Sequence, residues 1–257
     1  MPNICIVTSV GKNGKWASLG ARDLYNALKK LGAKVVRSES SVAGYFNVGW
    51  GKSGSNLNKK LPSSKLWELQ TLAKAGVPVV PFSTNFDEAK KLAVSWRKGL
   101  ILPIFGRKLK HTRGLDIVKY EPTPSGYVVP ARRTVSDFYT VALPKTAEYR
   151  VHVFGGKAVR SGTKMKENGT THDAQPIWNL DHGFQIRYEN PAPGSAKEVA
   201  KAAVKAAGVD FAAVDVIQTG GGLWPLRFWV LELNCAPGLH GNTVAKYADH
   251  ILKAATA

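Results

Sequence analysis

Three residues near the carboxyl end of the chain could form an oxygen-rich site for a divalent cation. They are Asp215, in the run Val-Asp-Val, and Glu232 and Asn234, in the run Leu-Glu-Leu-Asn-Cys-Ala-Pro-Gly-Leu. Glu232 and Asn234 point the same way because side chains alternate between the faces of a strand. If Asp215 faces them, two carboxylates and an amide oxygen converge. This ligand set suits Mg²⁺ and does not suit zinc, whose usual ligands are Cys and His. The chemistry predicted is that of a metal nucleotide.

The same residues have a simpler interpretation. A glutamate and an asparagine at the end of a strand are more often solvated or cap a turn. An acidic pair in an otherwise apolar strand, however, lowers stability unless a cation compensates it. We therefore expect Asp215 and Glu232 to have a cationic partner.

A β-hairpin is the element that must position these residues. Segments 211–217 and 228–233 are rich in β-branched and aromatic residues, and 218–225 between them contains three consecutive glycines. Upstream, Gly155-Gly156 joins a second pair of expected strands. Residues 3–37 are expected to form a strand–helix–strand unit, and the Gly, Ser and Asn residues of 49–64 predict a linker. The remaining expected strands are 77–82, 100–107, 115–121, 138–142, 148–154 and 157–164, and the expected helices are 18–31, 64–75, 85–95, 196–207 and 243–254.

Composition indicates an ordered globular protein with an unusual charge. The chain has 257 residues, 44% of them apolar, and 36 basic against 18 acidic residues give a formal net charge of +18. Such a charge favours a polyanionic partner, an acidic substrate or several phosphates, although solubility alone is an alternative. Lys197, Lys201 and Lys205 repeat every four residues and predict a solvent-exposed helix face. The better functional candidates are the clusters in the middle of the chain: Arg107, Lys108, Lys110, His111 and Arg113, and Lys157, Arg160, Lys164 and Lys166.

Cellular location is constrained mainly by what the sequence lacks. Cys5 and Cys235 show no metal-ligand spacing, so reduced cytosolic thiols are expected. We find no signal peptide, and no run approaches the roughly 20 apolar residues of a membrane span. We expect a cytoplasmic protein without a membrane partner.

Together these motifs resemble the ATP-grasp superfamily over roughly residues 57–250. The Asp-Val pair and the Leu-Glu-x-Asn-x-x-Pro-Gly-Leu run look like the metal strands of D-alanine:D-alanine ligases and ribosomal-protein glutamate ligases. The run 148–154, followed by Gly156-Lys157 and Lys164, resembles especially the short ATP-grasp proteins of bacteriophages, as do 47–51 and 75–79. A phage origin would place the protein in the host cytoplasm.

The resemblance implies an α+β chain with the ATP-grasp fold, in which two α+β subdomains clamp ATP, preceded by a small Rossmann-like βαβ module. We expect that module at 1–56. The subdomain with the mobile phosphate loop is expected at 57–137, and the C-terminal subdomain with the metal hairpin at 138–257.

The resemblance also implies which residues contact ATP. The segment Lys108 to Gly114 occupies the position of the mobile phosphate loop, with one glycine where the family has several. Arg107 stands where the family has a lysine, which keeps the charge but presents a planar fork. Lys65 matches an earlier nucleotide-contacting lysine, with a solvated helix lysine as the alternative. The expected nucleotide contacts are Lys65, Arg107, Lys108, Gly114, Asp137, Phe138 and Tyr139.

Arg150 and Lys164 are the expected catalytic residues. A strand interior rarely accepts an arginine without an anion to pair, so Arg150 is the candidate for the transferred phosphate, and Lys164 could reach the same group. D-alanine ligases place an arginine where this chain has Ala213, so that role passes to Arg150 or Asn179. His152 lies on the same strand face as Arg150, and either a core histidine or a substrate contact is consistent with the sequence.

The activity implied is carboxylate–amine ligation with ATP and Mg²⁺ through an acylphosphate. Replacing Asp215 or Glu232 by alanine should abolish turnover and leave the fold largely intact. The acceptor could be a nucleic acid or modified base, an acidic peptide or a small molecule, and a nucleotide-dependent binding or host-interaction module that has lost ligation is the alternative. We expect acceptor specificity in 165–183, a long polar segment that contains His172, Asp173, Asn179 and His182.

Overall fold

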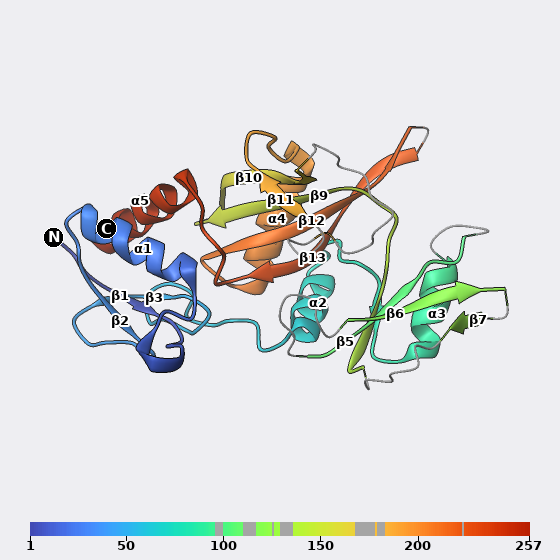
Figure 1. The fold of residues 1–257 in the computed structure, drawn as a ribbon, viewed down its shortest axis with the longest axis horizontal. Coiled ribbons are helices and arrows are strands. Elements are labelled where there is room, and N and C mark those ends of the chain that lie inside the picture. Colours follow the sequence, from blue (N-terminus) through green and yellow to red (C-terminus); the bar gives the residue numbers. More distant parts are fainter. Residues whose placement is uncertain are drawn as a thin grey trace.

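The computed structural model describes residues 1–95, 100–109, 117–124, 126–128, 136–167, 178, 183–222 and 224–257. The described residues form three sheets, which follow one another along the longest axis of the molecule (Figure 1). The small N-terminal sheet lies at one end, the sheet with the predicted hairpin in the middle, and a third sheet at the other end. Within the described ranges, no helix has the length and apolar character needed to cross a membrane.

The N-terminal sheet is parallel and has the strand order β2-β1-β3. It contains β1 (Asn3–Val7), β2 (Lys34–Ser38) and β3 (Phe46–Gly49), with helix α1 (Leu19–Lys30) between the first two strands. Ser18 begins α1 by accepting a hydrogen bond from the backbone N–H of Ala21, which satisfies a donor that the helix leaves unpaired.

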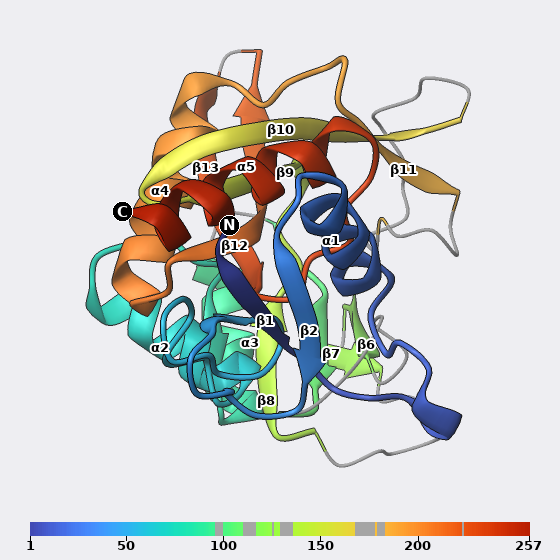
Figure 2. The ribbon, with the colours of Figure 1, turned by 90° about the vertical axis from the view of Figure 1, so that its left-hand side faces the viewer.

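The last helix of the chain completes the core of this N-terminal part. Helix α5 (Asn242–Thr256) lies beside α1 (Figures 1 and 2). Its residues Tyr247 and Ile251 are fully buried in one apolar cluster with Ile4 and Leu24. The core around β1 therefore combines the two ends of the sequence.

The segment 49–64, expected to be a linker, is instead anchored to the body of the protein. Trp50 and Asn58 are buried. The Asn58 side chain accepts hydrogen bonds from the backbone N–H groups of Asp210 and Phe211 and donates one to the Phe211 carbonyl. The linker prediction was wrong in this respect, because the polar residues that are typical of a linker here satisfy the backbone of a neighbouring strand.

The middle sheet is antiparallel, in the order β11-β10-β9-β12-β13. Its strands are β9 (Lys145–Phe154), β10 (Lys157–Lys166), β11 (Phe184–Arg187), β12 (Phe211–Gly221) and β13 (Trp224–Asn234). Both predicted hairpins are confirmed: β12 pairs with β13, and β9 turns into β10 at Gly155 and Gly156, whose positive φ angles of 53° and 74° favour glycine. Helix α4 (Gly194–Ala207) packs on this sheet through buried Ala and Val side chains, and α2 (Lys65–Lys74) packs on α4 and β13.

The third sheet has the order β4-β8-β5-β6-β7 and is also antiparallel. Its elements are β4 (Phe82–Ser83), helix α3 (Phe86–Ser95), β5 (Ile104–Arg107), β6 (Val118–Thr123), β7 (Gly126–Val128) and β8 (Phe138–Val141). Since β8 pairs with β5, this sheet spans the expected boundary between residues 137 and 138.

The strand expected at 77–82 is reduced to β4 and one bridge. Val79 forms a parallel bridge with Val230, and the Pro78 carbonyl accepts a hydrogen bond from the Val230 N–H. Pro78 and Pro81 carry no N–H, so they cannot donate to a ladder. The segment therefore runs beside the edge strand β13 without becoming a regular strand.

Candidate functional site

One face of the middle sheet carries a row of charged side chains, which we call the charged face. In the register of the sheet, Asp215 on β12 lies directly opposite Arg150 on β9 and directly opposite Glu232 on β13. Residues opposed in this way project from the same face. The charged face consists of Lys145, Glu148, Arg150, Lys164, Asp215 and Glu232, with Lys65 from α2 beside it.

Asp215 is held by two cations. Arg150 donates through Nε to Oδ1 at 2.7 Å and through Nη2 to Oδ2 at 2.8 Å, and Lys164 Nζ lies 3.2 Å from Oδ2. Burial opposes ionisation of this carboxyl group, whose side chain is 6% exposed, but the charges of Arg150 and Lys164 hold the pKa of Asp215 well below its usual range. The expected cationic partner of this acid is therefore Arg150, in a bidentate pair.

Glu148 is a member of the charged face that the sequence analysis did not single out. It pairs with Lys164 and with Lys145, and its side chain is buried. Lys145 Nζ also lies 4.2 Å from the centre of the Trp178 ring, and burial lowers the pKa of Lys145. The spacing of Glu148 and Arg150, two residues apart on one strand, was the available signal, because it places both on the same face.

Glu232 has a separate partner, Lys65. The two charged groups are 3.4 Å apart, and Lys65 Nζ also donates to the Leu233 carbonyl at 3.0 Å. The charge of Lys65 lowers the pKa of Glu232. Lys65 is the first residue of α2, and a quarter of its side chain is exposed, so the expected nucleotide-contacting lysine lies at the charged face and is not a freely solvated helix lysine.

Glu68 supports this pair from the next turn of α2. It accepts a hydrogen bond from the Leu233 N–H at 2.7 Å and lies 3.5 Å from Lys65. Burial raises the pKa of Glu68 to about 7. No local pattern indicates this role, because the contact joins residues that are far apart in the chain.

The predicted metal ligands are oxygen donors, and each of the three side chains makes a contact within the protein. Asp215 and Glu232 are engaged as described, and Asn234 Oδ1 accepts a hydrogen bond from the Ala236 N–H at 2.9 Å, which is the turn-capping alternative. No group of three or more His, Cys, Asp and Glu residues with metal-binding geometry occurs in the described ranges. Mg²⁺ typically takes one or two carboxylates and completes its shell with water and phosphates, so this oxygen donor set fits that ion.

The expected nucleotide residues outside the middle sheet have different surroundings. Arg107 donates through Nε to Thr140 at 3.0 Å. Burial lowers the pKa of Arg107, and the negative charges of Glu232, Glu68 and Glu148 partly offset this shift. Its guanidinium therefore lies within electrostatic reach of the charged face.

Residues Asp137 to Tyr139 make contacts within the third sheet. Asp137 accepts from the Leu109 N–H at 2.8 Å and lies 3.7 Å from Lys108. Phe138 is fully buried in the core, and the Tyr139 ring packs 5.1 Å from that of Phe86. In this arrangement Phe138 presents no surface to a nucleotide. Gly114, the rest of the phosphate loop beyond Leu109, and His172, Asp173, Asn179 and His182 lie outside the described residues.

His152 is a buried, hydrogen-bonded histidine. Its Nδ1 lies 3.2 Å from the Tyr247 hydroxyl and its Nε2 lies 2.9 Å from the Tyr188 hydroxyl. Burial, followed by the charge of Arg150, lowers the pKa of His152 to about 3. The ring is therefore neutral, and its two hydrogen bonds support the interpretation as a core histidine.

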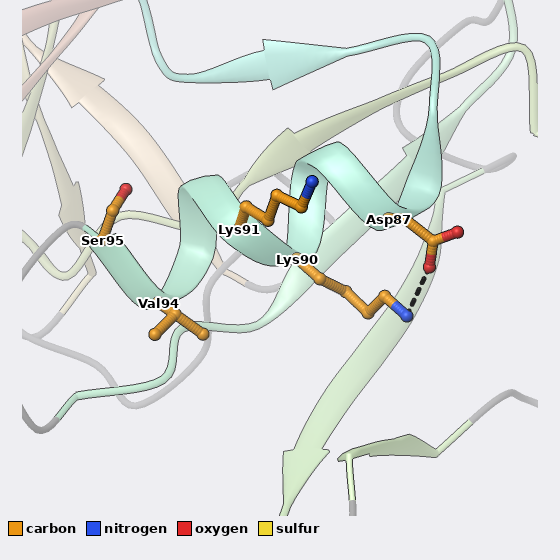
Figure 3. Close-up of a pocket in the computed structure, with 5 residues that line it drawn as sticks. All are labelled: Asp87, Lys90, Lys91, Val94 and Ser95. Carbon is orange, nitrogen blue, oxygen red and sulfur yellow. Dashed lines mark ion pairs between the residues drawn. The ribbon is translucent and has the colours of Figure 1, made fainter.

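One open hollow on the described surface lies away from the charged face. It has a volume of about 540 Å³ and is lined by Asp87, Lys90, Lys91, Val94 and Ser95 of α3 (Figure 3). Lys90 pairs with Asp87 at 2.5 Å, and the side chains lie along an exposed helix face. None of the residues of the charged face contributes to it, so we do not place the site there.

Comparison with known proteins identifies the fold. No protein-family model and no curated protein matches the sequence. Among solved structures, D-alanine--D-alanine ligase from Bacillus anthracis complexed with ATP matches with a TM-score of 0.62 and 16% identity, over 100% of this chain and 97% of that chain. The ATP-grasp ligase PsnB complexed with minimal precursor, Mg and ADP matches with a TM-score of 0.63 and 10% identity, over 99% and 98%. The macrocyclase MdnC from Microcystis aeruginosa, bound with precursor peptide MdnA, matches with 0.57 and 13%, over 98% and 100%. The chain therefore has the ATP-grasp fold.

Proposed function

We propose that the protein is an ATP- and Mg²⁺-dependent carboxylate–amine ligase. The observation that carries the proposal is the charged face. There Arg150 and Lys164 form ion pairs with Asp215, and Asp215 lies directly opposite Glu232 on the neighbouring strand. In an ATP-grasp fold, this concentration of cations and oxygen donors suits a polyphosphate and its metal ion. Arg107 on the third sheet, which lies within electrostatic reach of Glu232 and Glu148, would close on the nucleotide from the other side.

The proposed reaction has two steps, and neither needs a nucleophile from the protein. A substrate carboxylate oxygen attacks the γ-phosphorus of ATP, the bond from that phosphorus to the bridging oxygen breaks, and ADP leaves. An amine nitrogen then attacks the acyl carbon, the bond to the phosphate oxygen breaks, the nitrogen loses a proton, and inorganic phosphate leaves. Arg150 and Lys164 would neutralise charge on the transferred group and hold it in line.

The metal ion would be held by Asp215, Glu232 and Asn234. When bound, Mg²⁺ supplies positive charge to the phosphate oxygens. Arg150 binds both carboxylate oxygens of Asp215. For Asp215 to bind the metal ion, the Arg150 guanidinium would therefore have to leave the carboxylate and bind phosphate oxygens of the nucleotide.

An acidic peptide is the proposed acceptor. PsnB and MdnC were solved with precursor peptides, which supports a peptide-type partner. The formal charge of +18 would attract an acidic one. Nucleic acid would be indicated instead by binding that weakens steeply between low and moderate salt.

A second candidate is a nucleotide-binding module that does not ligate. It is favoured by the Asp215 carboxylate, which Arg150 and Lys164 satisfy without any ligand. It predicts ATP binding without ADP formation in the presence of any acid and amine.

The test is ADP formation while candidate acids, amines and acidic peptides are screened with Mg²⁺ and ATP, with mass spectrometry to detect a new amide. Asp215→Asn and Glu232→Ala should abolish turnover. Asp249→Asn is the matched control, because Asp249 forms an exposed ion pair with Lys253 on α5. ADP formation by Glu232→Ala at the wild-type rate would overturn the proposed mechanism.

A further inference from the structure

A second cationic position lies on the same sheet face as the Arg150–Asp215 pair. The guanidinium of Arg160 stacks on the Tyr188 ring, with 4.1 Å between its central carbon and the ring centre. Its Nη1 atom is buried and has no hydrogen-bond partner in the structure as described. A buried N–H donor of a charged group lowers the stability of the protein when it has no acceptor. A bound anion would supply that acceptor.

A β-bulge aims Arg160 at this face. The register of β10 against β9 shifts between Ala158 and Arg160, so that Arg160 lies opposite His152 and Gly162 opposite Arg150. Without the extra residue, Arg160 would be displaced by one position and would project from the opposite face of the sheet. The irregularity therefore brings a further cation to the face that holds Arg150 and Lys164.

Among the described residues, the side chain stacked on Arg160 and the one opposite it in the sheet, Tyr188 and His152, are both neutral. The Tyr188 hydroxyl binds the neutral ring of His152. Thr243 is fully buried, and its hydroxyl lies close to that of Tyr188 but makes no well-aligned hydrogen bond within the described ranges. Asp215, the acid on this part of the face, is already neutralised by Arg150 and Lys164. We call Arg160, Tyr188, His152 and Thr243 the Arg160 pocket.

We propose that the Arg160 pocket binds a carboxylate of the substrate other than the carboxylate that reacts. His152, the register partner of Arg160, is two residues from Arg150 on β9, which corresponds to about 7 Å along the strand. A substrate whose reacting carboxylate receives the phosphate beside Arg150, and whose second carboxylate binds Arg160, would carry the two groups at about this spacing. An acidic amino acid, a peptide with an acidic residue and a dicarboxylic acid are of this kind. The assignment to the substrate rests on the proposed ligase function.

The pocket is tested without ATP. Thermal unfolding is followed while propionate, its neutral amide propionamide, or inorganic phosphate is titrated at constant ionic strength. Wild-type protein should show a saturable rise in Tm with propionate and no rise with propionamide. Arg160→Met should weaken the apparent affinity for propionate at least about tenfold. Lys201→Met, at a half-buried lysine of α4 that pairs with Glu198, is the control and should behave like wild type.

Two further comparisons keep the outcome decisive. If Arg160→Met fails to fold in chloride alone, Arg160→Lys replaces it, because it keeps the charge and loses the planar fork, and it should also bind propionate more weakly. No saturable rise in the wild type, an equal rise in Arg160→Met, or a rise with phosphate and none with propionate would each overturn the proposal. Because no ATP is present, a failure here leaves the ligase proposal standing, and an absence of ADP formation leaves the anion pocket standing.

Discussion

Asp215 and Glu232 face each other directly across β12 and β13, yet each is neutralised by different cations. Arg150 and Lys164 hold Asp215, whereas Lys65 holds Glu232. Two carboxylates on neighbouring strands would repel each other, and this division of partners allows both to stay ionised in the sheet.

The two acids should therefore differ in their effect on stability. Asp215→Ala leaves Arg150 and Lys164, which are 18% and 12% exposed, without their shared carboxylate. We expect the free energy of unfolding to fall by about 3 kcal/mol, the cost typical of breaking a buried ion pair. Glu232→Ala should cost less, because its side chain is 31% exposed and Lys65 keeps Glu68. Urea denaturation of both variants measures the difference, and equal losses would contradict it.

Arg150 should be replaceable for folding but not for catalysis. Arg150→Lys keeps a positive charge beside Asp215 but cannot reproduce the two parallel hydrogen bonds at 2.7 and 2.8 Å. We expect the rate of ADP formation to fall by roughly 10²–10³, the range found when a group that stabilises the transition state is removed. Initial rates at saturating ATP measure this, with Lys201→Met as the control. A rate within a few-fold of wild type would exclude a phosphate contact that requires the fork.

His152 should make the protein sensitive to acid. Its pKa is about 3 in the folded protein and 6.5 in the unfolded chain, so between these values the unfolded state binds one more proton than the folded state. The contribution of His152 to stability is complete above pH 6.5 and falls as the pH decreases toward 3, by up to about 1.4 kcal/mol per pH unit.

The measurement is the difference between wild type and His152→Gln in the free energy of unfolding, taken at several values between pH 4 and pH 7. Carboxyl groups that titrate in both proteins cancel in this difference. The stability of the variant should depend less steeply on pH. Parallel curves for the two proteins would show that the ring is not held neutral.

Asn58 should be sensitive to replacement for two separable reasons. Its φ of 52° favours asparagine or glycine, and its side chain satisfies the backbone of Asp210 and Phe211. Asn58→Gly relieves the backbone requirement and removes only the hydrogen bonds, with an expected cost of about 2 kcal/mol. Asn58→Ala should cost about 1 kcal/mol more. Denaturant midpoints of the two variants separate the terms, and equal midpoints would show that the positive φ carries no strain.

Local pattern predicted those parts of the fold that local chemistry determines. The glycines between 218 and 225 and the β-branched residues on either side predicted the β12–β13 hairpin, and strand alternation placed His152 and Arg150 on one face. The pattern at 77–82 predicted a strand because the apolar residues of the segment outweighed its two prolines. In the structure the segment forms only one bridge and the short strand β4, because the prolines lack the N–H groups that a regular strand needs.

The partners of the site residues could not be predicted in the same way. That Arg150 pairs with Asp215, Lys65 with Glu232 and Glu68 with Leu233 depends on how distant segments meet. The bulge that turns Arg160 toward this face is likewise visible only in the register of two strands. Residue type and spacing indicate which groups need a partner, and the tertiary fold decides which one they obtain.

The packing of α5 against α1 has a consequence for the order of folding. Ile4 and Leu24 precede the other two sheets in the sequence, while Tyr247 and Ile251, which complete their core, follow those sheets. The apolar side chains of β1 and α1 must therefore stay uncovered while the two intervening sheets are synthesised. Contacts of such long sequence separation slow folding, and during this interval the nascent protein is most exposed to aggregation.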